Sequence, residues 1–176
     1  MLALHVVAIP TFVISLQALD AILEKAEAFC AAKKIDPTVL AATRLIPDML
    51  PLTRQVLIAC DFAKNGSARL AGIEPPVFED NETTLAQLRE RIARTIAYVQ
   101  SVDPALIDAA PGRIVEMKTR TNRLRQEASL HLVHFILPNF YFHVTTAYAI
   151  LRSSGLEIGK LDFMGAVPGL ERLPLE

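Results

Sequence analysis

The sequence predicts an all-α protein: an antiparallel four-helix bundle with short extra helical turns and an irregular C-terminal tail. Three observations support this prediction. Apolar residues recur at steps of three and four over long segments, helix-capping residues stand directly before prolines, and aromatic residues make up only 6% with no Trp. With 176 residues, of which 52% are hydrophobic, the chain suits one domain over residues 1–176.

The first helix is expected to begin near Ile9, because Pro10 is tolerated in an opening turn. Lys33-Lys34 should end it, since basic side chains suit the negative end of the helix dipole. Asp36-Pro37 then predicts a cap and a first-turn proline for a short helix through Leu40. The buried stripe of the first helix consists of Phe12, Leu16, Leu19, Leu23 and Ala26.

A second long helix is expected from about Pro47 or Pro51 to Asn65, with Gly66 as its stop and residues 68–72 as a brief extra turn. The proline-containing stretch that follows must be a loop. Residues 80–83 offer capping side chains for a third helix that ends near residue 100. The apolar stripe of that helix is Leu85, Leu88, Ile92, Ile96 and Val99.

The C-terminal half combines short elements with one long helical region. Asp103-Pro104 repeats the pairing of a cap with a proline, and residues 114–119 alternate enough to form a brief extended segment. The last helical region covers residues 127–153, where Pro138 either kinks one helix or separates two. Gly155 should end it, and the tail is expected to cross the bundle as an irregular strap.

Charge and cysteine usage narrow the class of protein. A net charge of −1 predicts neither a nucleic-acid partner nor a polybasic membrane anchor. The apolar segment 1–19 has no basic residue before Lys25, which argues against a signal peptide and favours a core helix of a soluble bundle. Cys30 and Cys60 lie in apolar helical patterns without zinc-site spacing, so we expect free buried thiols and a cytoplasmic protein.

The last helix carries the most suggestive polar set. At about 100° per residue, Asn139, His143 and Thr146 share one face of a generally apolar helix. Polar groups inside a bundle are either hydrogen-bonded or functional. Two interpretations of His143 therefore stay open: a hydrogen-bonded core histidine, or a base or ligand that lines a pocket.

Two further sets are weaker. Asp48 and Gln55 share a face if the second helix covers both, but Asp48 is also a natural N-cap. Glu127, His131 and His134 have the spacing of a carboxylate and two imidazoles that could hold a metal, although such spacings also arise by chance on exposed faces. The sequence contains no glycine-rich phosphate loop, no G-x-S-x-G and no H-E-x-x-H motif.

Four ordered motifs over nearly the whole chain resemble one bacterial and fungal family, the domain-of-unknown-function family 1993 of the DinB/YfiT-like superfamily. They are Arg44-Leu45-Ile46-Pro47-Asp48-Met49, Phe78-x-Asp80-x-Glu82-x-Thr84, Leu137-Pro138-Asn139-Phe140-Tyr141-Phe142-His143 through Arg152, and Gly159-Lys160-x-Asp162-Phe163-Met164-Gly165. The resemblance implies a four-helix bundle that is often a homodimer.

The resemblance also implies a place for a site. Many DinB-like proteins bind a divalent metal through one histidine of the second helix and an H-x-x-x-H pair of the last, and some of these are thiol transferases or hydrolases. Here His143 matches the second histidine of the pair, Asn139 stands at the first, and Gln55 stands at or near the position in the second helix. Amides are poor ligands for zinc or nickel, so no metal ligand is assigned, and a divalent transition metal stays open as a cofactor.

Two functional hypotheses follow. In the first, the protein binds a small molecule or assembles with itself, as a homodimer, around a pocket at His143. In the second, it is an enzyme, either a metal-dependent thiol transferase or hydrolase, or a metal-free enzyme with His143 as general base. The catalytic candidates are His143 and Asp48, and the candidate ligand-binding residues are Gln55, Asn139 and Thr146. Neither nucleic acid nor a membrane is expected as a partner.

Overall fold

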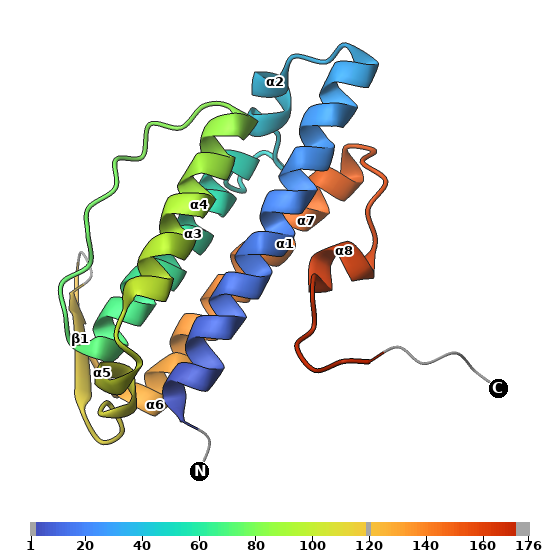
Figure 1. The fold of residues 1–176 in the computed structure, drawn as a ribbon. Coiled ribbons are helices and arrows are strands. Elements are labelled where there is room, and N and C mark those ends of the chain that lie inside the picture. The colour runs from blue at the N-terminus through green and yellow to red at the C-terminus, as the bar shows by residue number, and fades with distance from the viewer. Residues whose placement is uncertain (1–2, 119–120, 172–176) are drawn as a thin grey trace.

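The computed structural model describes residues 3–118 and 121–171, and it is mostly helical with one small two-stranded sheet (Figure 1). The prediction of an all-α protein therefore needs one correction, because the chain also contains a β-hairpin. In chain order the elements are α1 (Leu4–Lys33), α2 (Pro37–Ala42), α3 (Leu52–Ala71), α4 (Leu85–Ser101), α5 (Pro104–Asp108), β1 (Ile114–Lys118), β2 (Arg123–Glu127), α6 (Ala128–His131), the π-helical turn η1 (Leu132–Ile136), α7 (Leu137–Ser153) and α8 (Lys160–Met164).

The long helices α1, α3, α4 and α7 lie side by side and enclose the core (Figure 1). Helix α3 packs against α4 and α7, and α1 packs against α4 and α7. At the centre, the rings of Phe12 on α1 and Phe140 on α7 meet edge to face with centroids 5.1 Å apart. On the surface, Arg89 of α4 donates to Asp20 and Glu27 of α1, which ties these two helices together.

Helix α1 begins at Leu4, five residues before the expected start at Ile9. Asp108 explains the difference, because its carboxylate accepts from the backbone N–H of His5 at 3.1 Å and compensates the positive end of the helix dipole. By its length and composition the helix could span a membrane, but the core helix of a soluble protein passes the same test. Its stripe from Phe12 to Cys30 is buried against neighbouring helices, as in a core helix.

Helix α3 does not stop at Gly66 but continues to Ala71, and Gly72 ends it with a φ of 73°. Gly66 is fully inside the helix and faces Ile136 of η1. A Cβ placed on Gly66 would stand 2.9 Å from the Cγ2 atom of Ile136. The glycine is therefore needed for the close approach of α3 to η1, and sequence pattern alone assigned it the wrong role.

We expect Gly66→Ala to destabilise the protein by about 1–3 kcal/mol, because the added methyl group overpacks this contact. In an Ile136→Ala background the same change should become neutral or stabilising by up to about 1 kcal/mol, since alanine has the better helix propensity and the clash is gone. Urea unfolding of the four proteins measures both effects. Equal effects of Gly66→Ala in the two backgrounds would contradict the proposed contact.

The short elements follow local rules. Asp36 and Asp103 cap α2 and α5 as expected, each accepting a backbone N–H two residues ahead. Helix α4 is capped by Thr84, whose side chain pairs with Gln87 in a capping box, and not by residues 80–83. The expected extended segment at 114–119 is β1 over its described part, and β2 pairs with it antiparallel so that Ile114 faces Glu127.

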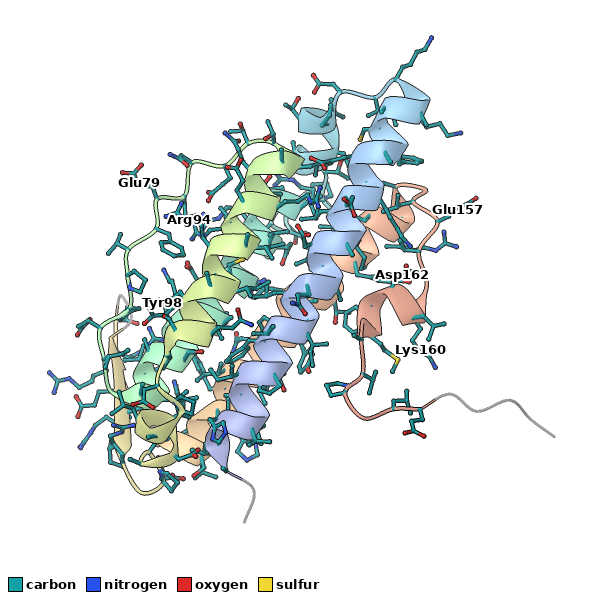
Figure 2. All side chains as sticks on the ribbon, viewed as in Figure 1. Glu79, Arg94, Tyr98, Glu157, Lys160 and Asp162 are labelled. Atoms are coloured by element: carbon teal, nitrogen blue, oxygen red, sulfur yellow. The ribbon has the colours of Figure 1, made fainter. Side chains whose placement is uncertain are left out.

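The last helical region is divided just before Pro138, which is one of the two expected outcomes: α7 begins at Leu137, and the proline lies in its first turn. Leu137 donates its backbone N–H to the carbonyl of Leu132, five residues back, so the π-helical turn η1 absorbs the irregularity just before the proline. The tail is less irregular than expected, because α8 packs against α1. Asp162, on the side of α8 that faces α1 (Figure 2), pairs with Lys25.

Candidate functional site

The structure brings Gln55 of α3 and His143 of α7 together in a hydrogen bond. The His143 Nδ1 atom lies 2.7 Å from Gln55 Oε1, while Gln55 Nε2 donates to the carbonyl of Leu50 at 3.0 Å. An amide oxygen can only accept, so Nδ1 of His143 carries the hydrogen. In the neutral ring, Nε2 is then left with a free lone pair.

His143 lies half-buried among aromatic rings. The Phe62 ring is stacked on it with centroids 6.0 Å apart, and the Phe142 ring meets it edge-on at 5.2 Å. Burial lowers the pKa of His143 from its ordinary value, because the charged imidazolium loses hydration there. At pH 7 the side chain is therefore a neutral imidazole with one fixed N–H and one free acceptor.

Asn139 and Thr146 share the helical face of His143, but each side chain donates to a backbone carbonyl four residues before it. Asn139 Nδ2 donates to the carbonyl of Phe135 at 2.7 Å, and Thr146 Oγ1 donates to the carbonyl of Phe142 at 2.7 Å. These bonds leave the Asn139 side-chain oxygen as an acceptor beside His143. The two residues thus shape the surroundings of the imidazole more than they supply donors.

Asp48 lies in an exposed turn, and α3 begins only at Leu52 with Pro51 at its N-cap. Asp48 is therefore neither a residue of this helix nor its N-cap, so both predictions for it, a shared helical face with Gln55 and a capping role, are wrong. In the described residues no hydrogen bond joins Asp48 to His143. The proline at position 51 ends the preceding turn and delays the helix.

A transition metal does not fit the residues around His143. The Gln55 oxygen already accepts from His143 Nδ1, both amide nitrogens donate to carbonyls, and only one imidazole is present. Glu127, of the second candidate set, caps α6 by accepting from Ser129 and Leu130, which lowers its pKa to about 2. Over residues 3–118 and 121–171, no group of three His, Cys, Asp or Glu side chains is arranged to hold a metal.

The sequence interpretation missed a cluster of charged side chains between α3, α4 and the loop 72–84, in which Arg91 and Glu82 are buried. Arg91 is 1% exposed, and its guanidinium binds Glu82 at 2.9 Å, Asp80 at 3.1 Å and Asp61 at 3.2 Å. Burial lowers the pKa of Arg91, but the adjacent Glu82 and Asp61 outweigh this and raise it above its ordinary value. The signal in the sequence was that Arg91 stands directly before Ile92 of the apolar stripe of α4, together with acidic residues in the preceding loop.

This cluster is structural. Arg91 also donates to the carbonyl of Glu79, and its guanidinium lies over the Phe78 ring, so it holds the loop against the helices. Arg94, on the side of α4 that faces this loop (Figure 2), also lies over the Phe78 ring. The motif Phe78-x-Asp80-x-Glu82 thus forms a loop anchor. Cys60, buried beside this cluster, is a free thiol whose pKa burial raises to about 12, which makes it unreactive.

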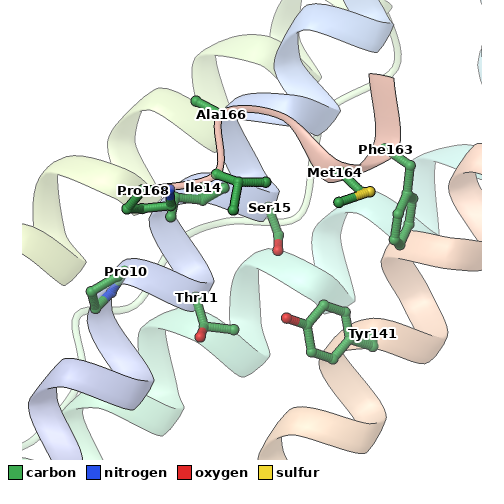
Figure 3. Close-up of a pocket in the computed structure, with 10 residues that line it drawn as sticks. Pro10, Thr11, Ile14, Ser15, Tyr141, Phe163, Met164, Ala166 and Pro168 are labelled. Carbon is green, nitrogen blue, oxygen red and sulfur yellow. The ribbon is translucent and has the colours of Figure 1, made fainter. Parts of the chain in front are cut away.

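Two cavities of the described structure lie away from His143. An apolar groove of about 360 Å³ runs between α1, α7 and the segment after α8, where Thr11, Ser15 and Tyr141 point toward one another (Figure 3). A second cavity, of about 260 Å³, lies between the hairpin and α6, with His131 in its wall. No residue of the set Gln55, Asn139, His143 and Thr146 lines either of these two cavities.

Comparisons with known proteins show the class to which the chain belongs. The chain is similar to a DinB family member from Shewanella denitrificans whose crystal structure is known, with a TM-score of 0.85, 41% sequence identity, and coverage of 97% of this chain and 96% of that chain. The family model for the domain of unknown function DUF1993 matches residues 4–164. A comparison with curated proteins gave no match.

The chain belongs to the DUF1993 family, and its fold is that of a DinB family member. This confirms the resemblance drawn from the sequence motifs.

Proposed function

We propose that this protein is a cytoplasmic, DinB-like antiparallel four-helix bundle that binds a small molecule at His143. The observation that carries the proposal is the bond between Gln55 and His143, which fixes the tautomer and presents Nε2 as an acceptor. Its ligand would carry a hydrogen-bond donor such as a hydroxyl, thiol or amine. The Phe62 and Phe142 rings would contact the apolar part of that ligand.

Catalysis with His143 as general base is the alternative, and two features favour binding over it. The group that orients Nδ1 is a neutral amide and not a carboxylate, so nothing in the pair stabilises an imidazolium once a proton has been accepted. Burial moreover lowers the pKa of His143, which makes it a weaker base at pH 7. A metal-dependent thiol transfer or hydrolysis would need ligands that Gln55 and Asn139 do not supply.

The experiment is a thermal-shift screen of small alcohols, thiols and amines against the wild-type chain and His143→Phe. A ligand at about 100 times its dissociation constant should stabilise the wild type by about 2.7 kcal/mol and leave His143→Phe unchanged. Gln55→Leu should bind the same ligand more weakly, because the tautomer is no longer fixed. Equal shifts of wild type and His143→Phe would refute the site.

The pH dependence of this binding has a definite sign. Because burial lowers the pKa of His143, Nε2 stays free at pH 7 and becomes protonated only as the pH falls below about 6.5, the ordinary histidine value. A protonated Nε2 cannot accept, so affinity should decline toward lower pH in the same screen. Binding that strengthens on acidification would instead indicate an anionic ligand.

A second copy of the chain is the proposed macromolecular partner. The apolar groove between α1 and α7 is bordered by exposed apolar side chains, among them Tyr141 at 40% and Met164 at 41% exposure. A face of this kind, in a family of frequent dimers, supports a homodimer with α1 and α7 at the interface. Sedimentation equilibrium should find a dimer for the wild type and a monomer for Tyr141→Glu, whereas a dimer in both would place the interface elsewhere.

A further inference from the structure

The cavity between the hairpin and α6 contains a second histidine in an unusual state. It is lined by side chains from both strands, from α6 and from η1, namely Val115, Leu124, Arg125, Gln126, His131 and Phe135. Its volume is about 260 Å³. His131 is twelve residues from His143, about 18 Å along a helical path, so this cavity is separate from the site proposed above.

His131 is almost completely buried and only half hydrogen-bonded. Its side chain is 3% exposed, and Nδ1 lies 3.2 Å from Gln126 Oε1. Because an amide oxygen only accepts, Nδ1 carries the hydrogen and Nε2 holds a lone pair. Within the described part of the chain this buried Nε2 has no hydrogen-bond partner. Buried polar atoms without a partner are rare in folded proteins and indicate a missing one.

The state of charge supports an acceptor at this point. Burial lowers the pKa of His131, and the nearby positive charge of Arg69 lowers it further. The imidazole is therefore neutral at pH 7, with Nε2 free to accept. On the cavity wall, Arg125 is already paired with Glu116 at 2.8 Å, so the wall presents no unpaired charge there for an ionic ligand.

The remaining walls suit a flat apolar molecule. Val115, Leu124 and Phe135 are hydrocarbon surfaces, and the Phe135 ring stacks on the His131 ring with centroids 4.9 Å apart and an angle of 14° between the planes. An apolar cavity of about 150 Å³ is enough to hold benzene. A cavity of about 260 Å³ therefore has room for one six-membered ring and a substituent.

We propose that this cavity binds a small hydroxylated aromatic molecule, with the ring against Val115, Leu124 and Phe135 and the hydroxyl donating to Nε2 of His131. This cavity shares no lining residue with the set Gln55, Asn139, His143 and Thr146. The competing explanation is a single bound water that satisfies Nε2, in which case the cavity would show no preference for a hydroxylated ring.

The test uses phenol and toluene, which have nearly the same shape and differ in the donor. The full-length chain, labelled with 15N-histidine, is titrated with each compound, and the His131 Nε2 resonance is followed together with the dissociation constants. Phenol binding should be saturable and should shift this resonance. Phenol should also bind at least about tenfold more tightly than toluene, which is the ratio that one good hydrogen bond provides. Equal affinities, or a phenol effect that does not saturate, would overturn the proposal.

Three variants give the control measurements. His131→Phe keeps an aromatic ring beside Phe135 and removes Nε2, so the preference for phenol should disappear. Val115→Phe fills the cavity, so both compounds should lose binding, and this variant carries the test if His131→Phe fails to fold. His143→Phe separates the two sites, because phenol also has the hydroxyl and the apolar part expected of a ligand at His143. In this variant the phenol-dependent shift of the His131 Nε2 resonance should saturate as in the wild type, and its loss would assign the effect to the other site and refute the proposal.

Discussion

Replacing Arg91 by alanine is expected to lower the free energy of unfolding by about 3–5 kcal/mol. The guanidinium is buried and binds Asp61, Asp80 and Glu82, of which Glu82 is itself buried. Removing the arginine leaves the buried carboxylate of Glu82 without its partner, which costs much more than the interaction itself contributes. Asp61 and Asp80 are partly exposed and keep Lys64 and Arg54 as partners. The loop 72–84, which Arg91 holds through the Glu79 carbonyl, would lose its anchor as well.

Urea unfolding at pH 7 measures this effect, and Arg94→Ala is the matched control. Arg94 is the same residue type on the same helix and covers the same Phe78 ring at 4.4 Å, but it is exposed. Its removal should cost about 1 kcal/mol or less, as for exposed cation–π contacts. If the two variants lost similar amounts of stability, the buried cluster would not be the anchor that its geometry indicates.

The double variant Gln55→His, Asn139→His is expected to gain a metal site. The structure places Gln55 within hydrogen-bond distance of His143, and Asn139 is one helical turn before His143 on α7. Three imidazoles at these positions would reproduce the ligand set that the resemblance to DinB-like proteins implies. Such a set binds zinc or nickel, whereas the two amides of the natural sequence do not.

Elemental analysis of tag-free protein after dialysis is the measurement. The double variant should retain about one zinc or nickel ion per chain, and the wild type less than about a tenth of that. The same variant with His143→Ala should lose the ion, which identifies His143 as the third ligand. A folded double variant without metal would show that the positions are not equivalent. Stoichiometric metal in the wild type would show that Gln55, Asn139 and His143 hold a metal despite their two amides.

Much of the helical framework could be predicted from the sequence because its causes are local. Apolar stripes at helical spacing predicted the buried faces of α1 and α4, and an aspartate before a proline predicted the starts of α2 and α5. The order of the motifs also predicted the family, which the comparisons confirm. Within the site, helical periodicity placed His143 on a polar face, and the resemblance indicated Gln55 as its neighbour.

What only the tertiary structure decided depends on partners that are distant in the chain. Gly66 has the chemistry of a helix stop, but the close approach of Ile136 makes it an interior residue. Asp80 and Glu82 have the chemistry of caps, but the buried charge of Arg91 binds them instead. Leu50 and Gln55 together decide which nitrogen of His143 carries the hydrogen, and the hairpin encloses the cavity beside His131. In each case burial and a contact between residues distant in the chain outweigh a local preference of about 1 kcal/mol. Such a contact cannot be read from a short stretch of sequence, because its two partners lie in different stretches.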